Sequence, residues 1–457
     1  MRLPEASLGS RFVLFRQFVD DDLGCASYLI GDANAGEAVV IDPGYEVEPY
    51  LEEAERRGAR IVRTLETHTH ADHVSGHGRL ALEHGVPVST HPAGAPEYPF
   101  DAIEDGDSVE IGDVVIRVVH TPGHRPEHCC FAVVDRSRGD EPWLVVTGDS
   151  LLVGSVARPD LAVEAVEGAR DLHRSLQALL ALPDGVEVYP GHVAGSLCGA
   201  QMSSKASTTI GFERRFNHVF TESEDDFVTE ATGGSAPRPP NMERIVALNR
   251  GPFLGAPEPL TTIESADGAV VLDVRQPEPF AAGHAAGAIN VPLTDSSFPT
   301  KAAFVLPTDA SVALHADSHG DADRAARGLR AVGILELAGR VVDPPADDRI
   351  QTVELEELET LLAEGEVTVL DVREKDERDE GYIAGSRHIP YRMVNAWVDD
   401  LRGAQPIVTI CSTGSRAAIA ASVLAAEGIE ARPVLHGGVE DWAERGGETV
   451  AFRRCGG

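Results

Sequence analysis

The chain has 457 residues, of which 42% are hydrophobic, and a formal net charge of −35 at pH 7. This length exceeds what one compact core usually holds, so we expect about two to four globular domains. The acidic balance argues against nucleic acid and anionic membranes as partners, and no apolar run approaches the roughly 20 residues of a membrane-spanning helix.

Six cysteines lie scattered along the chain without the regular spacing of a disulfide framework. The first ten residues lack the basic segment followed by an apolar segment that marks a secretory signal. Both features favour a reducing compartment, so we expect a cytoplasmic protein with one or two reactive thiols.

The chain begins with segments typical of strands at 12–18, 26–30 and 37–41, followed by a helix at 46–58. A short apolar strand at 61–66 then leads into Thr67-His68-Thr69-His70-Ala71-Asp72-His73. Imidazole and carboxylate are ligands that divalent zinc, iron and manganese prefer. These side chains are too closely spaced for one helix face, where neighbours lie three or four positions apart. The segment therefore predicts a loop wrapped around a metal ion.

A helix at 76–84, a strand at 86–90 and a hairpin over 109–120 follow. Three more candidate ligands come shortly after strand-like segments, each beside a glycine, namely His124, Asp149 and His192. If these strands share one sandwich, their ends converge on one point, and glycine lets the backbone approach closely. The H-x-H-x-D-H motif together with these residues resembles the metallo-β-lactamase superfamily. The resemblance implies an αββα sandwich, which we place at residues 1–243.

The resemblance is compatible with two kinds of metal site. A persulfide dioxygenase would hold one Fe(II) through His68, His124 and Asp149, and two histidines with one carboxylate leave positions for substrate sulfur and O₂. A glyoxalase II-like hydrolase of glutathione thioesters would instead hold two ions such as zinc and use a bridging hydroxide. The remaining members of the motif set either orient the first site or hold the second ion; they are His70, Asp72, His73 and His192.

Two further residues of this domain are functional candidates. The segment 148–154 and the following Arg158-Pro159-Asp160 resemble the dioxygenases, and Arg158 is expected to bind a substrate carboxylate or to pair with Asp160. Cys198, flanked by small residues, resembles a feature of persulfide dioxygenases fused to sulfurtransferase domains and is a candidate catalytic thiol. Cys129 and Cys130 are neighbours in a predicted strand, so they point to opposite faces and are expected to pack in the core.

The composition changes between residues 221 and 240. Four acidic residues lie between 222 and 226, and a stretch rich in glycine and proline runs from 233 to 240. This composition is typical of a linker.

The remainder of the chain contains an internal repeat, because 270–275 recurs at 368–373 and 283–288 recurs at 381–386. Each copy alternates apolar strands with helices, which implies a parallel sheet covered by helices. The pattern resembles rhodanese sulfurtransferase domains, and we place one at 244–345 and the other at 346–457.

The second copy carries the thiol chemistry. A strand at 406–410 leads into Cys411 and a loop of small residues, followed by a helix. Backbone N–H groups and the helix dipole at that position favour a thiolate and then a persulfide. Arg416 adds a positive charge that suits sulfite or thiosulfate, although Ser412 stands where rhodaneses often have a second basic residue. The first copy has no thiol in the matching segment 315–321, so we expect a scaffold role for it.

The order of these domains resembles bacterial persulfide dioxygenase–rhodanese fusions. The resemblance implies an α/β multidomain enzyme that oxidises a low-molecular-weight thiol persulfide with O₂ to thiol and sulfite. Cys411 would carry sulfane sulfur and form or consume thiosulfate. We further expect a homo-oligomer. The alternatives are the binuclear hydrolase fused to a sulfurtransferase and a non-enzymatic sulfur carrier or redox-sensing scaffold.

Overall fold

The computed structural model describes residues 13–160, 164–193, 205–233, 238, 240–294, 297–307 and 309–451. It divides into two compact units, Met1–Arg238 with Met242–Pro257, and Pro239–Asn241 with Glu258–Gly457. The first unit continues beyond residue 243 because helix α6 (Met242–Arg250) packs on it. The further division of the second unit near residue 345 stays a prediction. Cys198 lies outside the described residues.

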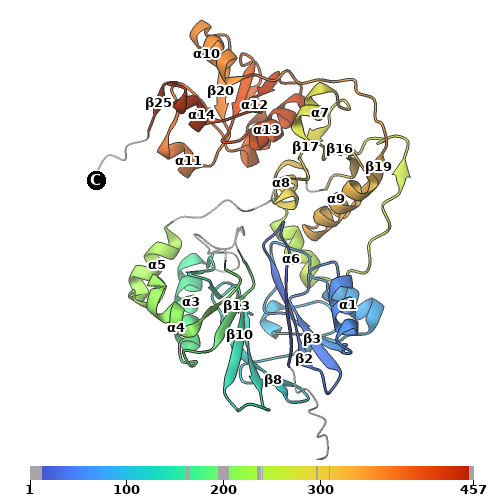
Figure 1. Cartoon of the computed structure of the whole chain (residues 1–457), viewed down its shortest axis with the longest axis vertical. Helices are drawn as coiled ribbons and strands as arrows, with labels where there is room; N and C mark the ends of the chain where they lie inside the picture. The colour runs from blue at the N-terminus through green and yellow to red at the C-terminus, as the bar shows by residue number, and fades with distance from the viewer. Residues whose placement is uncertain are drawn as a thin grey trace, which may run out of the picture. The chain divides into compact units, whose positions relative to one another are not determined.

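Two six-stranded sheets form the centre of the first unit (Figure 1). The first sheet has the order β1-β2-β3-β4-β5-β6, with β1–β3 antiparallel and β3–β6 parallel. Its strands are Val13–Val19, Ala26–Asp32, Glu37–Ile41, Arg60–Leu65, Val88–Thr90 and Asp101–Ala102. The three strands expected at the start of the chain are therefore confirmed, and they form an antiparallel meander.

The second sheet has the order β14-β13-β10-β9-β8-β7, in which only β10 and β13 run parallel. Its strands, from β7 onward, are Ser108–Ile111, Val114–His120, Cys129–Asp135, Pro142–Gly148, Glu187–Pro190 and Thr208–Thr209. A small hairpin, β11 (Leu151–Leu152) with β12 (Ser155–Val156), follows β10. The hairpin predicted over 109–120 is confirmed by the pairing of β7 with β8.

Side chains from both sheets meet in one apolar core, to which Tyr28, Leu65, Phe131 and Val146 belong. Helices α1 (Glu48–Arg56) and α2 (His77–His84) cover the outer face of the first sheet. Helices α3 (Ala165–Leu179) and α5 (Glu224–Thr232) cover the outer face of the second (Figure 1). The predicted αββα sandwich is therefore confirmed. Cys129 lies in the central core and Cys130 on the helix side, as alternation along a strand requires.

The acidic segment at 222–226 was expected to be part of a linker, and this is wrong. Ser223 caps helix α5, because its hydroxyl accepts a hydrogen bond from the backbone N–H of Asp226 at 3.2 Å. The acidic residues occupy the first turn, where the helix dipole favours negative charge. Phe227 then anchors the helix in the apolar core beneath it. Short helices α4 (Ile210–Phe216) and η2 (His218–Phe220) precede it.

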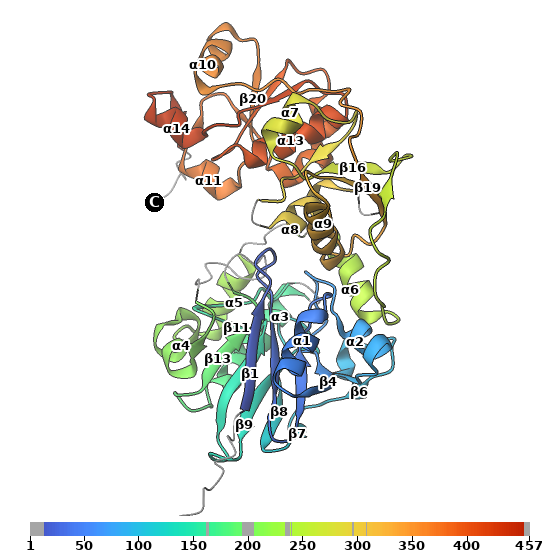
Figure 2. The ribbon, with the colours of Figure 1, turned by 45° about the vertical axis from the view of Figure 1, so that its right-hand side comes forward.

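The second unit contains two parallel sheets, as the repeat predicted (Figure 2). One has the order β15-β19-β18-β16-β17 and the other the order β22-β20-β23-β24, and every pair in both sheets is parallel. The strands of the first are Thr262–Ile263, Val270–Asp273, Ile289–Asn290, Val312–His315 and Leu337–Val341, numbered β15 to β19. Those of the second are β20 Thr368–Asp371, β22 Arg387–His388, β23 Ile407–Ile410 and β24 Ala431–Pro433.

Helices surround both sheets of this unit. The first copy contributes α7 (Pro277–Ala282), α8 (Phe298–Val305) and α9 (His319–Ala331). The second contributes α10 (Leu355–Glu364), α11 (Lys375–Glu380), η3 (Tyr391–Trp397), α12 (Val398–Leu401), α13 (Ser415–Ala426) and α14 (Val439–Glu444). The copies contact each other directly, since the backbone N–H of Asn290 donates to Ser422 Oγ at 2.9 Å. In the part of the chain that the structure describes, no helix has the length and apolar character needed to cross a bilayer.

Candidate functional site

The loop that follows β4 is fastened to the first unit by Asn249 of α6. The Asn249 amide donates to the carbonyls of His70 and His73 at 2.9 and 2.8 Å and accepts from the N–H of Ser75 at 2.8 Å. Asn249 is buried, so these bonds have little competition from water. A residue far along the sequence therefore fixes the backbone of the histidine-rich loop.

Three candidate ligands converge where their strands end. One ligand atom from each of His68, His124 and Asp149 lies within 4.8 Å of the others, and all three side chains are buried. Oδ2 of Asp149 is 3.5 Å from Nε2 of His124 and 3.9 Å from Nε2 of His68. This oxygen is buried without a hydrogen-bond partner, which is costly for a carboxylate unless a cation satisfies it. The arrangement therefore fits a bound metal ion.

Hydrogen bonds set the tautomers of both histidines. Nδ1 of His124 lies 3.0 Å from the carbonyl oxygen of Arg158, which only accepts, so Nδ1 carries the proton. The hydroxyl of Thr67 donates to Asp42 at 2.8 Å and therefore accepts from Nδ1 of His68 at 2.9 Å. Nε2 of each ring is left with a lone pair directed toward Asp149, which is the form that a metal ligand requires.

Electrostatics favour the same protonation states. Burial lowers the pKa of His124, and burial together with His70 and His124 holds the pKa of His68 well below its usual range. Burial alone would raise the pKa of Asp149, but His192 and His124 lower it below its usual range. Two neutral imidazoles and one ionised carboxylate are a donor set suited to Fe(II), with zinc as a second fit.

The other four candidate ligands are engaged with partners of their own. His192 bridges two carboxylates, with Nδ1 at 2.7 Å from Asp149 Oδ1 and Nε2 at 2.6 Å from Asp72 Oδ2. Nδ1 of His73 is 3.3 Å from Asp72 Oδ1. Nε2 of His70 forms ion pairs with Asp42 and Glu66 at 3.2 and 3.3 Å. These contacts orient the three-residue set, and His70, Asp72 and His73 also lie close enough to one another to hold a second ion.

Several residues of this site were not expected from the sequence. Asp42 and Glu66 are buried behind His70, and Cys25 places its thiol 3.2 Å from Asp72 Oδ2 and 3.4 Å from His192 Nε2. They come from different strands or loops, so only the fold brings them to the site. Asp42 does sit directly after β3, and a ligand-type residue at a strand end was the signal that could have revealed it.

His128 is the most central of the residues that the sequence did not reveal. Its Nε2 accepts a hydrogen bond from the backbone N–H of Asp149 at 3.0 Å, so Nδ1 carries the proton and donates to Thr121 Oγ1 at 2.8 Å. Burial lowers the pKa of His128 to about 3, which keeps the ring neutral. Gly148 makes room for it, since a Cβ there would lie 2.7 Å from both His128 Nε2 and Thr67 Oγ1. His128 therefore positions the backbone of Asp149.

Arg158 contributes to the site through its backbone. Its guanidinium pairs with Asp160, Nε to Oδ1 at 2.6 Å and Nη2 to Oδ2 at 2.7 Å. Of the two roles expected for this side chain, the structure contains the pairing with Asp160, while the carbonyl of Arg158 orients His124.

The second candidate site lies in the other unit, at the end of β23. Cys411 is fully buried, and its Sγ accepts a hydrogen bond from the N–H of Gly414 at 3.0 Å. Gly414 precedes α13 and has a φ of +93°, and a Cβ there would lie 2.0 Å from the carbonyl oxygen of Leu435. Only glycine fits, and no side chain caps α13. The N–H of Gly414, just before α13, is therefore available to the sulfur atom.

Arg416 lies in the first turn of α13 and is tightly held. Its two Nη atoms bind the carboxylate of Glu377 at 2.6 and 2.7 Å, and Nη2 also donates to Ser412 Oγ at 2.7 Å. Burial alone would raise the pKa of Glu377, but Arg416 and the N–H of Glu374 lower it. The predicted cation thus lies beside the thiol loop, paired with a carboxylate.

The first copy of the repeat uses the same position differently. Ala316 follows β18 as Cys411 follows β23, because Val274 N–H binds the carbonyl of His315 as Val372 N–H binds that of Ile410. Ser318 caps α9 by accepting from the N–H of Asp321 at 3.1 Å. In α9 a serine side chain therefore accepts the hydrogen bond of a first-turn N–H. At the start of α13 the N–H of Gly414 instead donates to the sulfur atom of Cys411.

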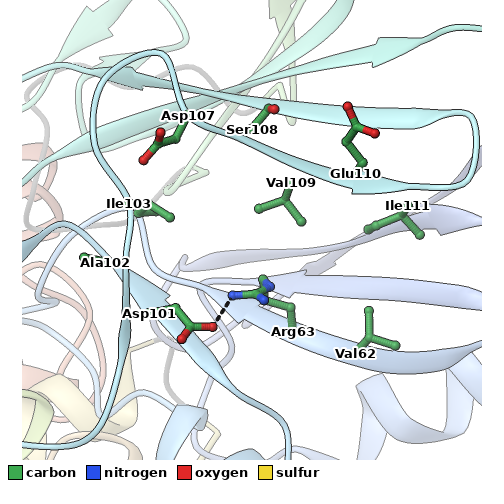
Figure 3. Close-up of a pocket in the computed structure, with 10 residues that line it drawn as sticks. All are labelled: Val62, Arg63, Asp101, Ala102, Ile103, Asp107, Ser108, Val109, Glu110 and Ile111. Atoms are coloured by element: carbon green, nitrogen blue, oxygen red, sulfur yellow. Dashed lines mark hydrogen bonds and ion pairs between the residues drawn. The ribbon is translucent and has the colours of Figure 1, made fainter.

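A cavity of about 500 Å³ elsewhere in the first unit is not a competing site. It lies between β4, β6 and β7 and contains the ion pair of Arg63 with Asp101 at 2.6 Å (Figure 3). Asp107 and Glu110 are its other charged lining residues. Its lining includes no thiol and none of the candidate metal ligands.

Comparisons with known proteins match different families to the two compact units. Residues 20–192 match the metallo-beta-lactamase superfamily, and residues 258–341 and 354–445 each match the rhodanese-like domain. The human protein named persulfide dioxygenase ETHE1, mitochondrial, is 30% identical over 241 residues, which cover 52% of this chain and 87% of the relative. An uncharacterized protein of Aquifex aeolicus is 33% identical over 209 residues, covering 41% of this chain and 88% of that protein.

A solved structure extends the likeness beyond the first unit. The crystal structure described as a metallo-beta-lactamase from Staphylococcus aureus is 29% identical, with a TM-score of 0.66. The match covers 73% of this chain and 99% of the solved one. The fold of that protein therefore includes more than the sandwich domain.

Proposed function

The chain belongs to the persulfide dioxygenase family, as a metallo-beta-lactamase domain followed by two rhodanese-like domains, and we propose that it detoxifies sulfide in two steps. In the first unit, a low-molecular-weight thiol persulfide reacts with O₂ and water to give thiol and sulfite. In the second, Cys411 carries sulfane sulfur to or from small acceptors, forming or consuming thiosulfate. A cytoplasmic location and a homo-oligomer are further parts of this proposal.

One observation carries the oxygenase part of the proposal: Oδ2 of Asp149 is buried, unpaired and faces the lone pairs of His68 and His124. These three residues would hold a single Fe(II) ion. When bound, such an ion supplies open coordination positions at which a persulfide sulfur and O₂ can meet. His192 bridges Asp149 and Asp72, while His70, Asp72 and His73 could hold a second ion, so the metal content of the protein separates the oxygenase from the binuclear hydrolase.

The residues around the ligands have definable tasks. Thr67 and the Arg158 carbonyl hold the protons on Nδ1, so that Nε2 of each ligand histidine stays available. His192 binds the second oxygen of Asp149 and thereby limits that carboxylate to one free oxygen. His128 holds the Asp149 backbone from behind. The site would therefore be formed before substrate arrives, with little rearrangement needed.

Sulfur transfer in the second unit would use Cys411 as nucleophile. Its thiolate attacks the outer sulfur of a donor, a new S–S bond forms at Sγ, and the donor S–S bond breaks with its electron pair leaving on the departing group. The N–H of Gly414, at 3.0 Å from Sγ, stabilises the negative charge before and after transfer. Placing both steps in one chain raises the effective concentration of the shared intermediate.

The test is an oxygen-electrode measurement with glutathione persulfide combined with metal analysis. We expect O₂ consumption, formation of sulfite and about one iron per chain in protein purified without air. Two zinc ions per chain with hydrolysis of a glutathione thioester would instead support the binuclear hydrolase. If the metal-loaded protein shows neither activity, the remaining alternative is the non-enzymatic sulfur-carrier scaffold.

A further inference from the structure

We propose that the Cys411 site exchanges sulfane sulfur with organic thiols and their persulfides in preference to thiosulfate and sulfite, and that Glu377 sets this preference. The inference rests on the proposed function, because it names the substrate class of that same site. It is carried by two joined ion pairs of the second copy, Arg416 with Glu377 and Arg392 with Glu374.

Arg416 directly follows the thiol loop, and three of the five N–H groups of its guanidinium donate to Glu377 or Ser412. Glu377 binds both Nη atoms of its guanidinium, at 2.6 and 2.7 Å, and Nη2 is shared with Ser412 Oγ. The arginine side chain is 19% exposed and that of Glu377 36%, so the pair is partly shielded from water. Charge-assisted bidentate pairs of this kind are among the stronger interactions in proteins.

A second pair of the same kind adjoins the first. Arg392 of η3 binds Oε2 of Glu374 at 2.6 Å, and its side chain is 16% exposed. The backbone N–H of Glu374 donates to Oε2 of Glu377 at 3.0 Å, which joins the two ion pairs. Two arginines and two glutamates leave the cluster with no net charge, and Ser412 adds none.

This charge balance discriminates between sulfur donors. Thiosulfate and sulfite carry their charge on oxygen atoms, so binding them to Arg416 means displacing Glu377 and holding a dianion beside two carboxylates. A thiol persulfide carries no oxyanion on the sulfur atoms that react, so its sulfane sulfur can be transferred while both ion pairs stay intact. Because forward and reverse transfer share one transition state, the same cost applies to forming and to consuming thiosulfate.

The favoured reaction is balanced without another reagent. The Cys411 thiolate attacks the terminal sulfur of R–S–SH, the new Sγ–S bond forms, and the donor S–S bond breaks. The electron pair leaves on the R–S sulfur, which takes a proton from water and departs as the thiol. Cys411 sulfur is oxidised by the same amount as the departing sulfur is reduced, and the reverse reaction delivers sulfane sulfur to an organic thiol.

The experiment measures loading of the full-length protein in the absence of O₂, so that the first unit cannot consume the persulfide. Wild type, Glu377→Gln and Glu380→Gln are mixed separately with thiosulfate and with glutathione persulfide, and one added sulfur on the Cys411 peptide is followed by mass spectrometry. Glu380 is an exposed residue at the end of the same helix and serves as the matched control for charge. Cys411→Ser gives the blank.

The deciding quantity is the ratio of the two loading rates, because the donors differ in intrinsic reactivity. Glu377→Gln should shift the ratio roughly ten-fold toward thiosulfate, as expected when a charge-assisted pair no longer has to be broken. Glutamine still accepts the hydrogen bond that Glu377 takes from Glu374 N–H at 3.0 Å, so α11 keeps its start. Glu377→Asp keeps the charge at a shorter reach and should shift the ratio less.

An unchanged ratio in Glu377→Gln, or a shift toward the persulfide, would overturn the inference and leave the proposed function intact. An equal shift in Glu380→Gln would overturn it as well, because the effect would then be one of general charge. If wild-type Cys411 accepts sulfur from neither donor, the sulfurtransferase half of the proposed function fails, and this inference fails with it.

Discussion

Asp149 binds Nδ1 of His192 through Oδ1 at 2.7 Å and leaves Oδ2 without a partner, 3.5 Å from Nε2 of His124. The two oxygens of one carboxylate therefore have different surroundings. Oδ1 belongs to a hydrogen-bonded chain that continues through His192 to Asp72, and Oδ2 faces the two ligand histidines. Substitutions at Asp149 and at His192 should consequently have different effects on the metal.

Asp149→Ala should abolish metal binding, because it removes the one anionic donor of the set. His192→Gln should keep the metal but bind it roughly 10–100-fold more weakly, as found when a residue that orients a ligand is lost. Chelator competition followed by metal analysis measures both. His84→Gln, at an exposed histidine at the end of α2, is the control and should match wild type. Equal loss in Asp149→Ala and His192→Gln would contradict the asymmetric roles.

Cys411→Ser should leave O₂ consumption with glutathione persulfide within about two-fold of wild type, because the cysteine belongs to the other compact unit and to none of the metal-binding groups. Sulfane transfer should disappear. Glu380→Gln, at an exposed residue of the same unit, is the control and should keep both activities. Loss of O₂ consumption in Cys411→Ser would contradict separate sites.

Much of the fold, and the convergence of His68, His124 and Asp149, could be predicted from the sequence. Each of these residues follows a strand, and short apolar runs mark the strands. By contrast, His128 lies four residues after His124, and nothing local distinguishes it from a core histidine. Its role depends on the backbone N–H of Asp149, which only the pairing of β9 with β10 brings near. Contacts of this kind depend on tertiary structure, so spacing along the chain does not report them.

The acidic segment before α5 was misread for a similar reason. Composition alone indicated a linker, but the Ser223 cap and the buried Phe227 outweigh the charge of the first turn. A serine three residues before an acidic residue, followed by an apolar residue, was the available signal. The role of Glu377 was also hidden, since its partner Arg416 is distant in sequence and reaches it only in the folded domain.

His128→Ala should lower metal affinity by roughly ten-fold, because the N–H of Asp149 would lose its acceptor and the carboxylate its fixed position. His128→Gln offers an oxygen that can accept the same bond and should recover part of that affinity. The measurement is iron titration followed by electronic absorption and by electron paramagnetic resonance of the nitrosyl adduct, which report ligand geometry apart from turnover. Identical behaviour of Ala and Gln variants would indicate a packing role only.

Ala316→Cys should fail to create a second sulfur carrier in the first copy of the repeat. The introduced thiol would occupy the position that corresponds to Cys411, but Ser318 already caps α9 through the N–H of Asp321. Asp317 and Asp321 add negative charge where a persulfide anion would form. In a Cys411→Ser background, mass spectrometry after glutathione persulfide treatment should detect loading at least about ten-fold slower than at Cys411. Comparable loading would show that the loop alone suffices.

The stability of the metal-free protein should fall as pH rises from about 6.5 to 9. Burial and the neighbouring His73 lower the pKa of His70, but Asp42 and Glu66 outweigh them and raise it to about 9. The folded state therefore prefers the protonated ring, whose stabilising effect is fully present below the unfolded pKa of about 6.5 and is lost as pH rises through the folded value. A decrease in Tm on the order of 5 °C across this range is expected for a unit of this size.

His70→Gln should flatten this pH dependence, since glutamine stays neutral throughout, while His84→Gln should retain it. Thermal unfolding of chelator-treated protein, followed by circular dichroism between pH 6 and 10, provides the measurement. His73 acts in the same direction, because Cys25 and Asp72 raise its pKa well above the usual value despite burial, so the slope should decrease without vanishing. Burial lowers the pKa of His68 and His128, so their effects fall below pH 6.5. A Tm that holds constant or rises between pH 7 and 9 would mean that His70 is neutral in the folded protein.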